Sequence, residues 1–281
     1  MFHRWGLVCA LTVCAPSFAV LEMVADIEVE RGVPAWNTAI ENNAKALNAQ
    51  GVSTANGYAE CAETKEIEGA YLCGYLRGNT MNQAFARISM FIEGPLGHPK
   101  GQLPEHGSYV LSQAMRSLGG HDLLRKHFLD FYDKVRAECP ANAKVCLNTQ
   151  EQELWDELIE PLSKSVSDFV VISYGVFSHM PWRDVVTHEI MHAQYFMQPD
   201  FRTTADLFWE KDVDEADKKA ARGRLATYYD VNDQLLLINE FQAYILMSGA
   251  EQNLLDILVG KYRTRLMDAM AKNNVSPIQV K

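Results

Sequence analysis

The chain has 281 residues, 48% of them hydrophobic, and a net charge of −10 at pH 7. This length is sufficient for a substantial buried core. The acidic balance, with no basic run in the sequence, argues against nucleic acid or an anionic membrane surface as a partner. Because charged residues are 22% and no low-complexity tract occurs, we expect a globular protein.

The first residues have the pattern of a secretory signal. Arg4 precedes an apolar stretch over residues 6–15, and Ser17 and Ala19 follow the small-x-small rule for cleavage. We therefore predict a signal peptide over residues 1–19 and a mature chain in the periplasm or outside the cell. The apolar stretch is too short to span a bilayer, so no stable membrane insertion is expected after signal removal.

Four cysteines remain once residues 1–19 are set aside. An even number of cysteines in an exported chain favours disulfides, with three possible connectivities. We prefer the local pairs Cys61–Cys73 and Cys139–Cys146, because each pair brackets a short polar loop. A zinc site made of all four cysteines is the alternative, but the gaps are much longer than C-x2–4-C.

The hydrophobic pattern and the turn residues predict a mainly helical chain. Helices are expected over residues 34–50, 79–91, 108–118, 121–139, 149–162, 181–197 and 231–248, with a loop over 96–107 and a charged surface helix or insertion over 211–224. Residues 51–80 show no clear pattern, and the β-branched run 169–174 predicts a strand. The expected fold is α+β and mainly helical: a helical, disulfide-bonded portion over 20–165 and a core over 166–281, packed as one unit.

The predicted helix 181–197 contains an H-E-x-x-H motif, His188-Glu189-Ile190-Met191-His192. Residues four apart lie about 40° apart around a helix, so both imidazoles point the same way and can share one ion. The carboxylate of Glu189 lies beside that position, where it can hold a water molecule. Chance produces the motif in about 1–2% of chains of this composition, so it does not decide the question alone.

Burial adds independent weight, because Glu189 falls on the apolar face of this helix. An unpaired buried carboxylate costs several kcal/mol, and a metal ion would compensate it. The alternative is an ordinary amphipathic helix with two hydrogen-bonded histidines.

A catalytic zinc ion needs a third protein ligand and an open coordination position. No histidine follows His192 in the sequence, and Glu240 is a lone carboxylate in the apolar face of the predicted helix 231–248. We therefore predict a Zn²⁺ site formed by His188, His192 and Glu240, with Asp233 as the chief competitor for the third position. Weaker candidates are Asp206, Glu210 and Asp230.

The H-E-x-x-H motif followed by Asn239-Glu240 resembles the gluzincin group of zinc metallopeptidases over about residues 168–248. The resemblance implies a zincin-like core, His188, His192 and Glu240 as ligands, and Glu189 as general base. It also implies that strand 169–174 is the edge along which an extended peptide lies.

Two features depart from the thermolysin-like pattern of that group. The interval between His192 and Glu240 is longer, and Tyr244 stands where those enzymes carry an aspartate that orients a ligand imidazole. The partner of the ligand imidazoles is therefore left open, with Asp233 or a backbone carbonyl as candidates.

The expected activity is hydrolysis of a peptide or protein substrate by zinc-activated water, with Glu189 moving the proton. A further donor should stabilise the oxyanion, and Tyr195 and Tyr244 are the candidates we single out. Others are Tyr228, Tyr229 and His179. Alternatives are a zinc amidase or deacylase acting on cell-wall or modified substrates, and a non-catalytic secreted binding protein with a vestigial metal site. We expect solvated surface positions for His98, His106, His121 and His127.

Overall fold

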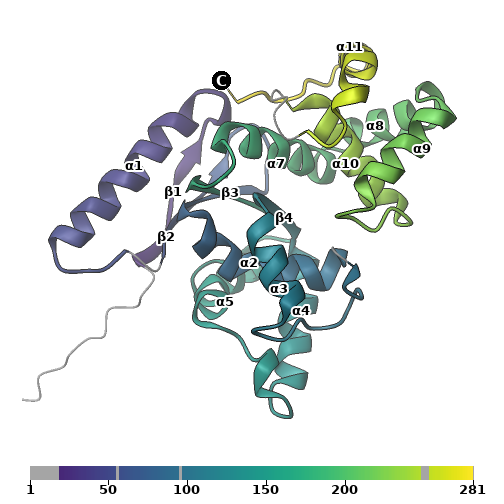
Figure 1. Cartoon of the computed structure of the whole chain (residues 1–281). Helices are drawn as coiled ribbons and strands as arrows, with labels where there is room; N and C mark the ends of the chain where they lie inside the picture. Colours follow the sequence, from purple (N-terminus) through teal and green to yellow (C-terminus); the bar gives the residue numbers. More distant parts are fainter. Residues whose placement is uncertain (1–18, 55–56, 95–96, 248–252, 281) are drawn as a thin grey trace, which may run out of the picture.

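The computed structural model describes residues 19–54, 57–94, 97–247 and 253–280. Apart from Ala19, the predicted signal peptide lies outside the described residues. A mixed sheet runs through the middle of the molecule in the order β1-β2-β3-β5-β4 (Figure 1). Its strands are β1 (Ala19–Ile27), β2 (Tyr58–Thr64), β3 (Ala70–Arg77), β4 (Gly120–Leu124) and β5 (Val170–Phe177). The pairs β1–β2 and β3–β5 are parallel, whereas β2–β3 and β4–β5 are antiparallel.

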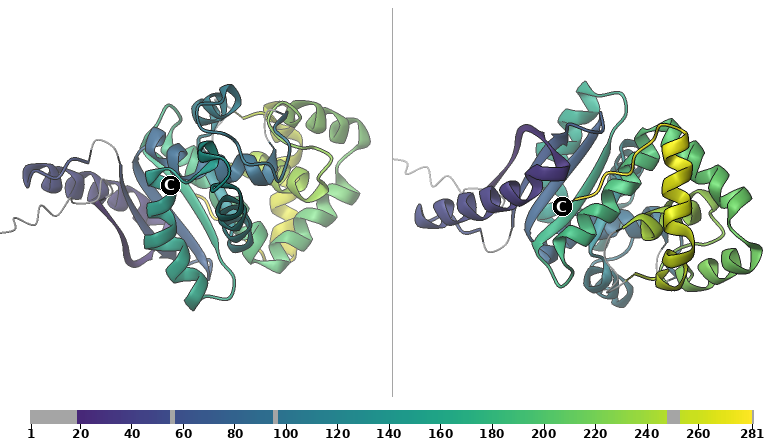
Figure 2. Two further views of the ribbon diagram at one scale, coloured as in Figure 1. Left: turned by 90° about the horizontal axis from the view of Figure 1, so that it is seen from below. Right: turned by 90° about the horizontal axis from the view of Figure 1, so that it is seen from above.

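Helices cover both faces of this sheet (Figures 1 and 2). On one face lie α2 (Gly78–Glu93), α4 (Arg125–Glu138), α5 (Thr149–Leu154), the π-helical turn η3 (Trp155–Ile159) and α6 (Glu160–Ser165), with α3 (Tyr109–Ser117) packed on α2. On the other lie α1 (Val29–Ala49) and α7 (Trp182–Met197), and beyond α7 lie α8 (Pro199–Asp212), α9 (Glu215–Leu225), α10 (Gln234–Leu246) and α11 (Asp256–Lys272). The molecule is a mainly helical α+β protein, as predicted.

Strand β5 shows how the sheet separates two cores. Val170, Ile172 and Tyr174 face the core under α1 and α7, whereas Phe169 and Val171 face the core under α2 and α4. Because both faces are buried, the strand reads as a continuous apolar run. The strand predicted over 169–174 is confirmed, but it lies between β3 and β4. It is therefore not the edge expected for a peptide substrate, and the edge strand on this side is β4.

The portion over residues 20–165 is less helical than predicted. Residues 51–80, which show no clear pattern, contain β2 and β3, and residues 121–124 belong to β4 rather than to a helix. Strand β2 is buried along almost all of its length, so it has no polar alternation to reveal it. Helix α1 begins at Val29, and Pro34 lies inside it rather than at its first position.

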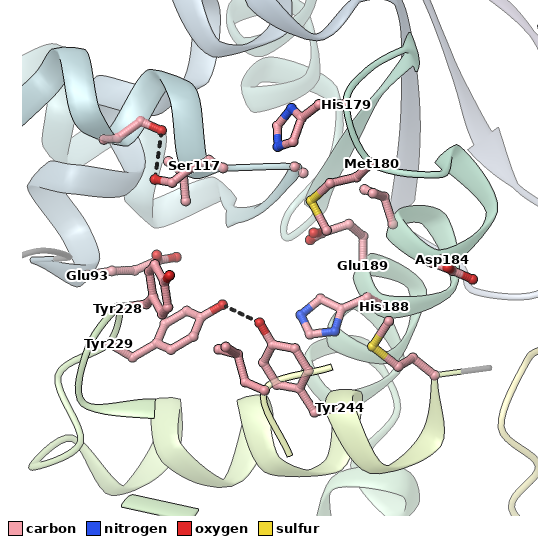
Figure 3. A pocket seen from close by; sticks show the side chains of 17 residues that line it. Glu93, Ser117, His179, Met180, Asp184, His188, Glu189, Tyr228, Tyr229 and Tyr244 are labelled. Atoms are coloured by element: carbon pink, nitrogen blue, oxygen red, sulfur yellow. Dashed lines mark hydrogen bonds between the residues drawn. The ribbon is translucent and has the colours of Figure 1, made fainter. Parts of the chain in front are cut away.

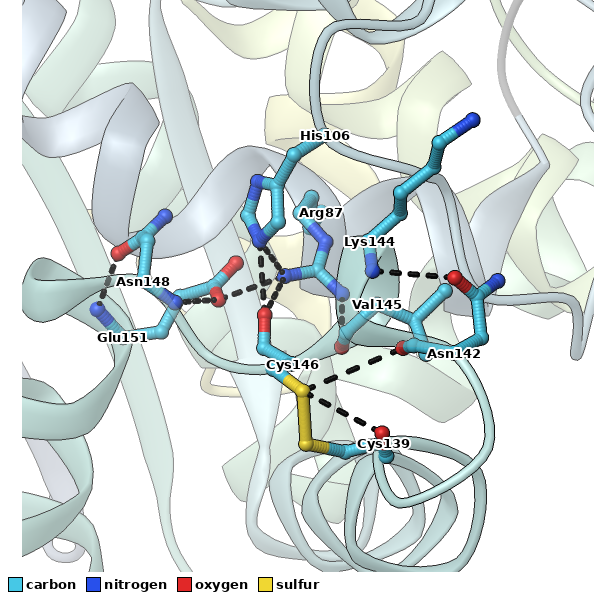
Figure 4. The surroundings of a disulfide bond; sticks show 9 residues. All are labelled: Arg87, His106, Cys139, Asn142, Lys144, Val145, Cys146, Asn148 and Glu151. Atoms are coloured by element: carbon cyan, nitrogen blue, oxygen red, sulfur yellow. Dashed lines mark hydrogen bonds and ion pairs between the residues drawn. A yellow bond between two sulfur atoms is a disulfide. The ribbon is translucent and has the colours of Figure 1, made fainter.

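Both predicted disulfides are present. Cys61 and Cys73 are directly opposite on β2 and β3, with Cα atoms 4.1 Å apart, and the Cys139–Cys146 bond closes the short loop after α4 (Figure 4). Disulfides of this kind are consistent with an oxidising compartment. Within the described residues, no helix has the length and apolar character needed to cross a membrane.

A buried arginine holds several loops onto α2 (Figure 4). The Arg87 side chain is 2% exposed and donates to Glu151 at 2.8 Å. Its guanidinium also donates to the backbone carbonyls of Pro104, Val145 and Cys146. These bonds fix the loop before α3, the disulfide loop and α5 against one helix, and that helix ends at Glu93.

His121 holds β4 against the same helix. Its ring nitrogens lie 2.8 Å from the Ser89 hydroxyl and 2.7 Å from the Asn82 side-chain oxygen. The surface position expected for His121 is wrong: it is 3% exposed, and burial lowers its pKa to about 3. Because side chains alternate along a strand, Gly120 and Asp122 face the opposite side, towards α7.

Candidate metal centre

Helix α7 carries the H-E-x-x-H motif and confirms the helix predicted over 181–197. It packs on β4, β5 and α10, so the motif lies at the junction of the sheet and the helical layer. The Nε2 atoms of His188 and His192 are 3.0 Å apart, and the two rings are nearly perpendicular, at 88°. The four-residue spacing therefore brings the two imidazoles to one point, as the sequence indicates.

Helix α10 brings the predicted third side chain to the same point. The Glu240 carboxylate lies 3.5 Å from His188 Nε2 and 3.7 Å from His192 Nε2. Ligand atoms about 2.0–2.1 Å from a tetrahedral zinc ion would be about 3.3 Å from each other. The three observed separations lie close to that value, so this buried His/His/Glu group could hold a metal ion.

Unsatisfied polar atoms surround this point. Glu240 Oε2, Glu189 Oε2 and the Nδ1 atoms of His188 and His192 are buried, and none has a hydrogen-bond partner among the described residues. Most buried polar atoms in proteins are paired, so four together require an explanation. A cation between the imidazoles and Glu240 would account for the carboxylate oxygen, whereas the Nδ1 atoms need partners of their own.

The electrostatics of the cluster also fit a cation. Burial lowers the pKa of both His188 and His192 to about 4, which keeps the imidazoles neutral, the form that binds metals. Burial and the charge of Glu240 raise the pKa of Glu93 to about 8 and that of Glu189 well above its usual range. These carboxylates repel one another, and a divalent ion would offset that repulsion.

Two acidic residues of this cluster, Glu93 and Asp122, were not predicted from the sequence. The Asp122 carboxylate lies 3.9 Å from His192 Nδ1, and Asp122, Glu189 and His192 form a second group whose ligand atoms lie within 4.8 Å of one another. Assigning the residues around Asp122 to a strand would have revealed this side chain, but residues 121–139 have the sequence pattern of one helix. Glu93 stands at the C-terminal end of α2, where only the packing of that helix brings it to the site.

Gly120 makes room for the general base predicted from the sequence. A Cβ atom at this position would lie 2.4 Å from Glu189 Oε1 and 2.8 Å from Glu189 Cγ. Any side chain here would push Glu189 out of its place beside the two imidazoles. The glycine thus leaves the space that the Glu189 side chain occupies.

The two tyrosines singled out from the sequence lie in different places. The Tyr244 ring packs against His188 with centroids 4.5 Å apart, and its hydroxyl lies 3.3 Å from that of Tyr229 (Figure 3). Tyr195 is buried elsewhere and donates to Asp206 at 2.6 Å. It shares the ligand face of α7, but seven residues after His188 it lies about 10 Å further along the axis. This placement does not fit the oxyanion role expected for Tyr195.

Asp233, the predicted competitor of Glu240, is also away from the imidazoles. It caps the N-terminus of α10 by accepting from the backbone N–H groups of Leu235 and Leu236, and it pairs with Lys100 at 3.0 Å. An aspartate two turns before Glu240 shares its face but marks the start of the helix.

The metal group lines a small cavity that adjoins a larger cleft. The small cavity has a volume of about 30 Å³, more than the roughly 10–15 Å³ that one water molecule requires. Next to it is a cleft of about 420 Å³ (Figure 3). Glu93, Gly120, His188, Glu189 and Tyr229 border both spaces. A ligand in the cleft would therefore meet Glu189 and the imidazole of His188 directly, whereas His192 lines the small cavity.

Comparison of the chain with protein families, curated proteins and solved structures finds no match. The fold and site together define a mainly helical α+β protein with a buried His/His/Glu candidate metal group. The likeness to gluzincins rests on the two sequence motifs alone.

Proposed function

We propose that the chain is an exported zinc-dependent hydrolase that cleaves peptide bonds. The observation that carries the proposal is the convergence of His188, His192 and Glu240, from two helices, on one buried point beside Glu189. The cleft gives this point access to a ligand. The two disulfides support export, and the resemblance of the motifs to gluzincins supports a peptide substrate.

In this proposal His188, His192 and Glu240 hold the ion. Zinc, when bound, supplies a Lewis acid that polarises a carbonyl and makes water more acidic. Glu189 borders both the cavity and the cleft, so its carboxylate can take a proton from the attacking water and pass it to the leaving amine. Gly120 leaves the space that this carboxylate occupies.

Tyr244 is the residue best placed to donate a hydrogen bond to the developing oxyanion. Its ring packs on His188, and its hydroxyl points into the cleft towards that of Tyr229. Loss of one such donor typically reduces kcat by about 10²–10³-fold. We therefore expect Tyr244→Phe to lower kcat by about that factor while zinc affinity stays close to that of the native protein.

The decisive experiment combines metal analysis with peptide hydrolysis. The purified chain should bind about one zinc ion, and Glu189→Gln should keep the ion but lose cleavage of a broad peptide library. Glu157→Gln, on an exposed position of η3, is the matched control and should cleave normally. Unaltered cleavage by zinc-loaded Glu189→Gln would contradict the proposal.

The same experiment separates the alternatives. Cleavage of a cell-wall preparation or of acylated substrates, with no cleavage of peptides, would replace the peptidase by an amidase or deacylase. Tight zinc binding without hydrolysis of any of these substrates would identify a binding protein.

A further inference from the structure

The cleft beside the metal group has a mostly apolar lining. Apolar side chains from several elements line it, including Leu118, Met180, Val185, Met247 and Leu254, together with three tyrosines. Its volume of about 420 Å³ lies at the lower end of the range for small-ligand pockets. This space suits one large side chain and the adjoining backbone.

The ionisable side chains that line the cleft include carboxyl groups and imidazoles but no strongly basic group among the described residues. Glu93, Asp184 and Glu189 line it, and among the described residues no lysine or arginine does. The nearby Lys100 is already paired with Asp230 and Asp233, at 3.3 and 3.0 Å. A carboxylate entering the cleft would lose its hydration among acidic side chains. Besides His188, the basic side chain that lines the cleft is His179, which is exposed to solvent.

We infer that the cleft binds a large uncharged side chain, aliphatic or aromatic, next to the scissile bond and rejects a free carboxylate. This inference rests on the proposed function and specifies its substrate class. The chain then cleaves within a peptide or near its N-terminus and does not release single residues from a C-terminus, because that reaction places a terminal carboxylate beside the scissile bond.

The preference can be measured by binding, without turnover. Three hydroxamates share a zinc-binding group and differ in the attached chain: acetohydroxamate, 3-phenylpropanohydroxamate and succinic monohydroxamate. On the zinc-loaded native chain, calorimetry should show the phenyl compound binding about 10–100-fold tighter than acetohydroxamate. The succinic compound should bind about tenfold more weakly than acetohydroxamate. Equal or tighter binding of the succinic compound relative to the phenyl compound would overturn the inference.

A matched pair of variants shows whether this cleft causes the preference. Leu254→Arg places a cation on the half-buried lining and should improve binding of succinic monohydroxamate about tenfold. Leu207→Arg makes the same change of charge on α8, where the side chain is 41% exposed, and should leave all three affinities unchanged. Identical effects of the two variants would contradict the assignment of the cleft.

The outcomes separate this inference from the proposed function. If the hydroxamates bind in the expected order but no peptide is cleaved, the hydrolase proposal falls and the preference of the cleft stands. If peptides are cleaved but the order fails, or single residues are released from C-termini, this inference alone falls. If the chain takes up no zinc and binds none of the three compounds, both fall.

Discussion

Two regions of this molecule bury charged side chains, and they satisfy them in opposite ways. Around Arg87 the guanidinium finds a carboxylate and three backbone carbonyls, and the charges of Arg87 and Glu151 cancel. Around His188 and His192 the imidazoles are neutral, and four carboxyl groups lie nearby, those of Glu93, Asp122, Glu189 and Glu240. Among the described residues, the first region is complete apart from one oxygen of Glu151, whereas the second is incomplete because it lacks a positive partner.

This difference separates a structural ion pair from a binding site. A structural pair is built to be stable alone, so removing one member leaves a buried charge unpaired. A binding site is built to be stable with its ligand, so supplying the ligand should stabilise it. The two regions should therefore respond in opposite ways to mutation and to added metal.

The largest expected effect is at the complete region. Arg87→Met should lower the free energy of unfolding by about 3–5 kcal/mol, because Glu151 would remain buried without its partner. Urea denaturation measures the change. Lys164→Met removes an exposed partner of Glu160 and should cost less than about 1 kcal/mol. Similar losses in both variants would show that the buried Arg87 ion pair contributes no more to stability than the exposed pair.

The incomplete region should respond to metal instead. Removing zinc with a chelator should lower the free energy of unfolding by about 3–4 kcal/mol, relative to protein in a free zinc concentration of about 100–1,000 times the dissociation constant. His188→Ala lacks one of the three ligands, so its stability should not depend on zinc. A shift of the same size in His188→Ala would place the ion elsewhere.

Histidines extend the comparison to pH. His121 has a partner for each ring nitrogen, and burial lowers its pKa to about 3, below the value of about 6.5 expected when the chain is unfolded. The unfolded chain therefore takes up a proton below pH 6.5 that the folded chain does not, and stability falls as the pH drops. His121 alone should contribute a loss of about 1.7 kcal/mol between pH 6.5 and 5.

The metal-free protein contains other buried histidines, so the His121 contribution must be isolated. The stabilities of the native chain and His121→Asn should differ in their pH slope by about half a proton at pH 6.5, rising to about one proton, or about 1.4 kcal/mol per pH unit, near pH 5. Parallel slopes would mean that His121 is protonated in the folded protein.

The sequence was informative where the signal is local. Helices α7 and α10 follow from periodicity and spacing, and both disulfides follow from short separations along the chain. Strands β2 and β4 depend on what pairs with them, so Gly120 and Asp122 could not be placed at the site. A helical wheel gives the direction of a side chain but not its position along the axis, so it could not show that Tyr195 lies about 10 Å beyond His188.

The smallest expected effect is that of a substitution at Asp122, which belongs to the part of the site that the sequence did not reveal. Its carboxylate is 3.9 Å from His192 Nδ1, an atom that has no hydrogen-bond partner among the described residues. Once Nε2 faces an ion, Nδ1 must carry the proton, and a carboxylate is the usual partner of such an N–H group. Asp122→Asn keeps the shape but removes the charge, and we expect it to weaken zinc binding roughly tenfold.

Competition with a chelator of known affinity measures this change, and Asp130→Asn on the exposed face of α4 is the matched control. If Asp122→Asn binds zinc as tightly as the control, the carboxylate does not orient His192. If the native chain binds two zinc ions and the variant binds one, Asp122 is itself a ligand, and the second acidic group is a metal site of its own. The balance of charge at the incomplete region would then require two cations rather than one.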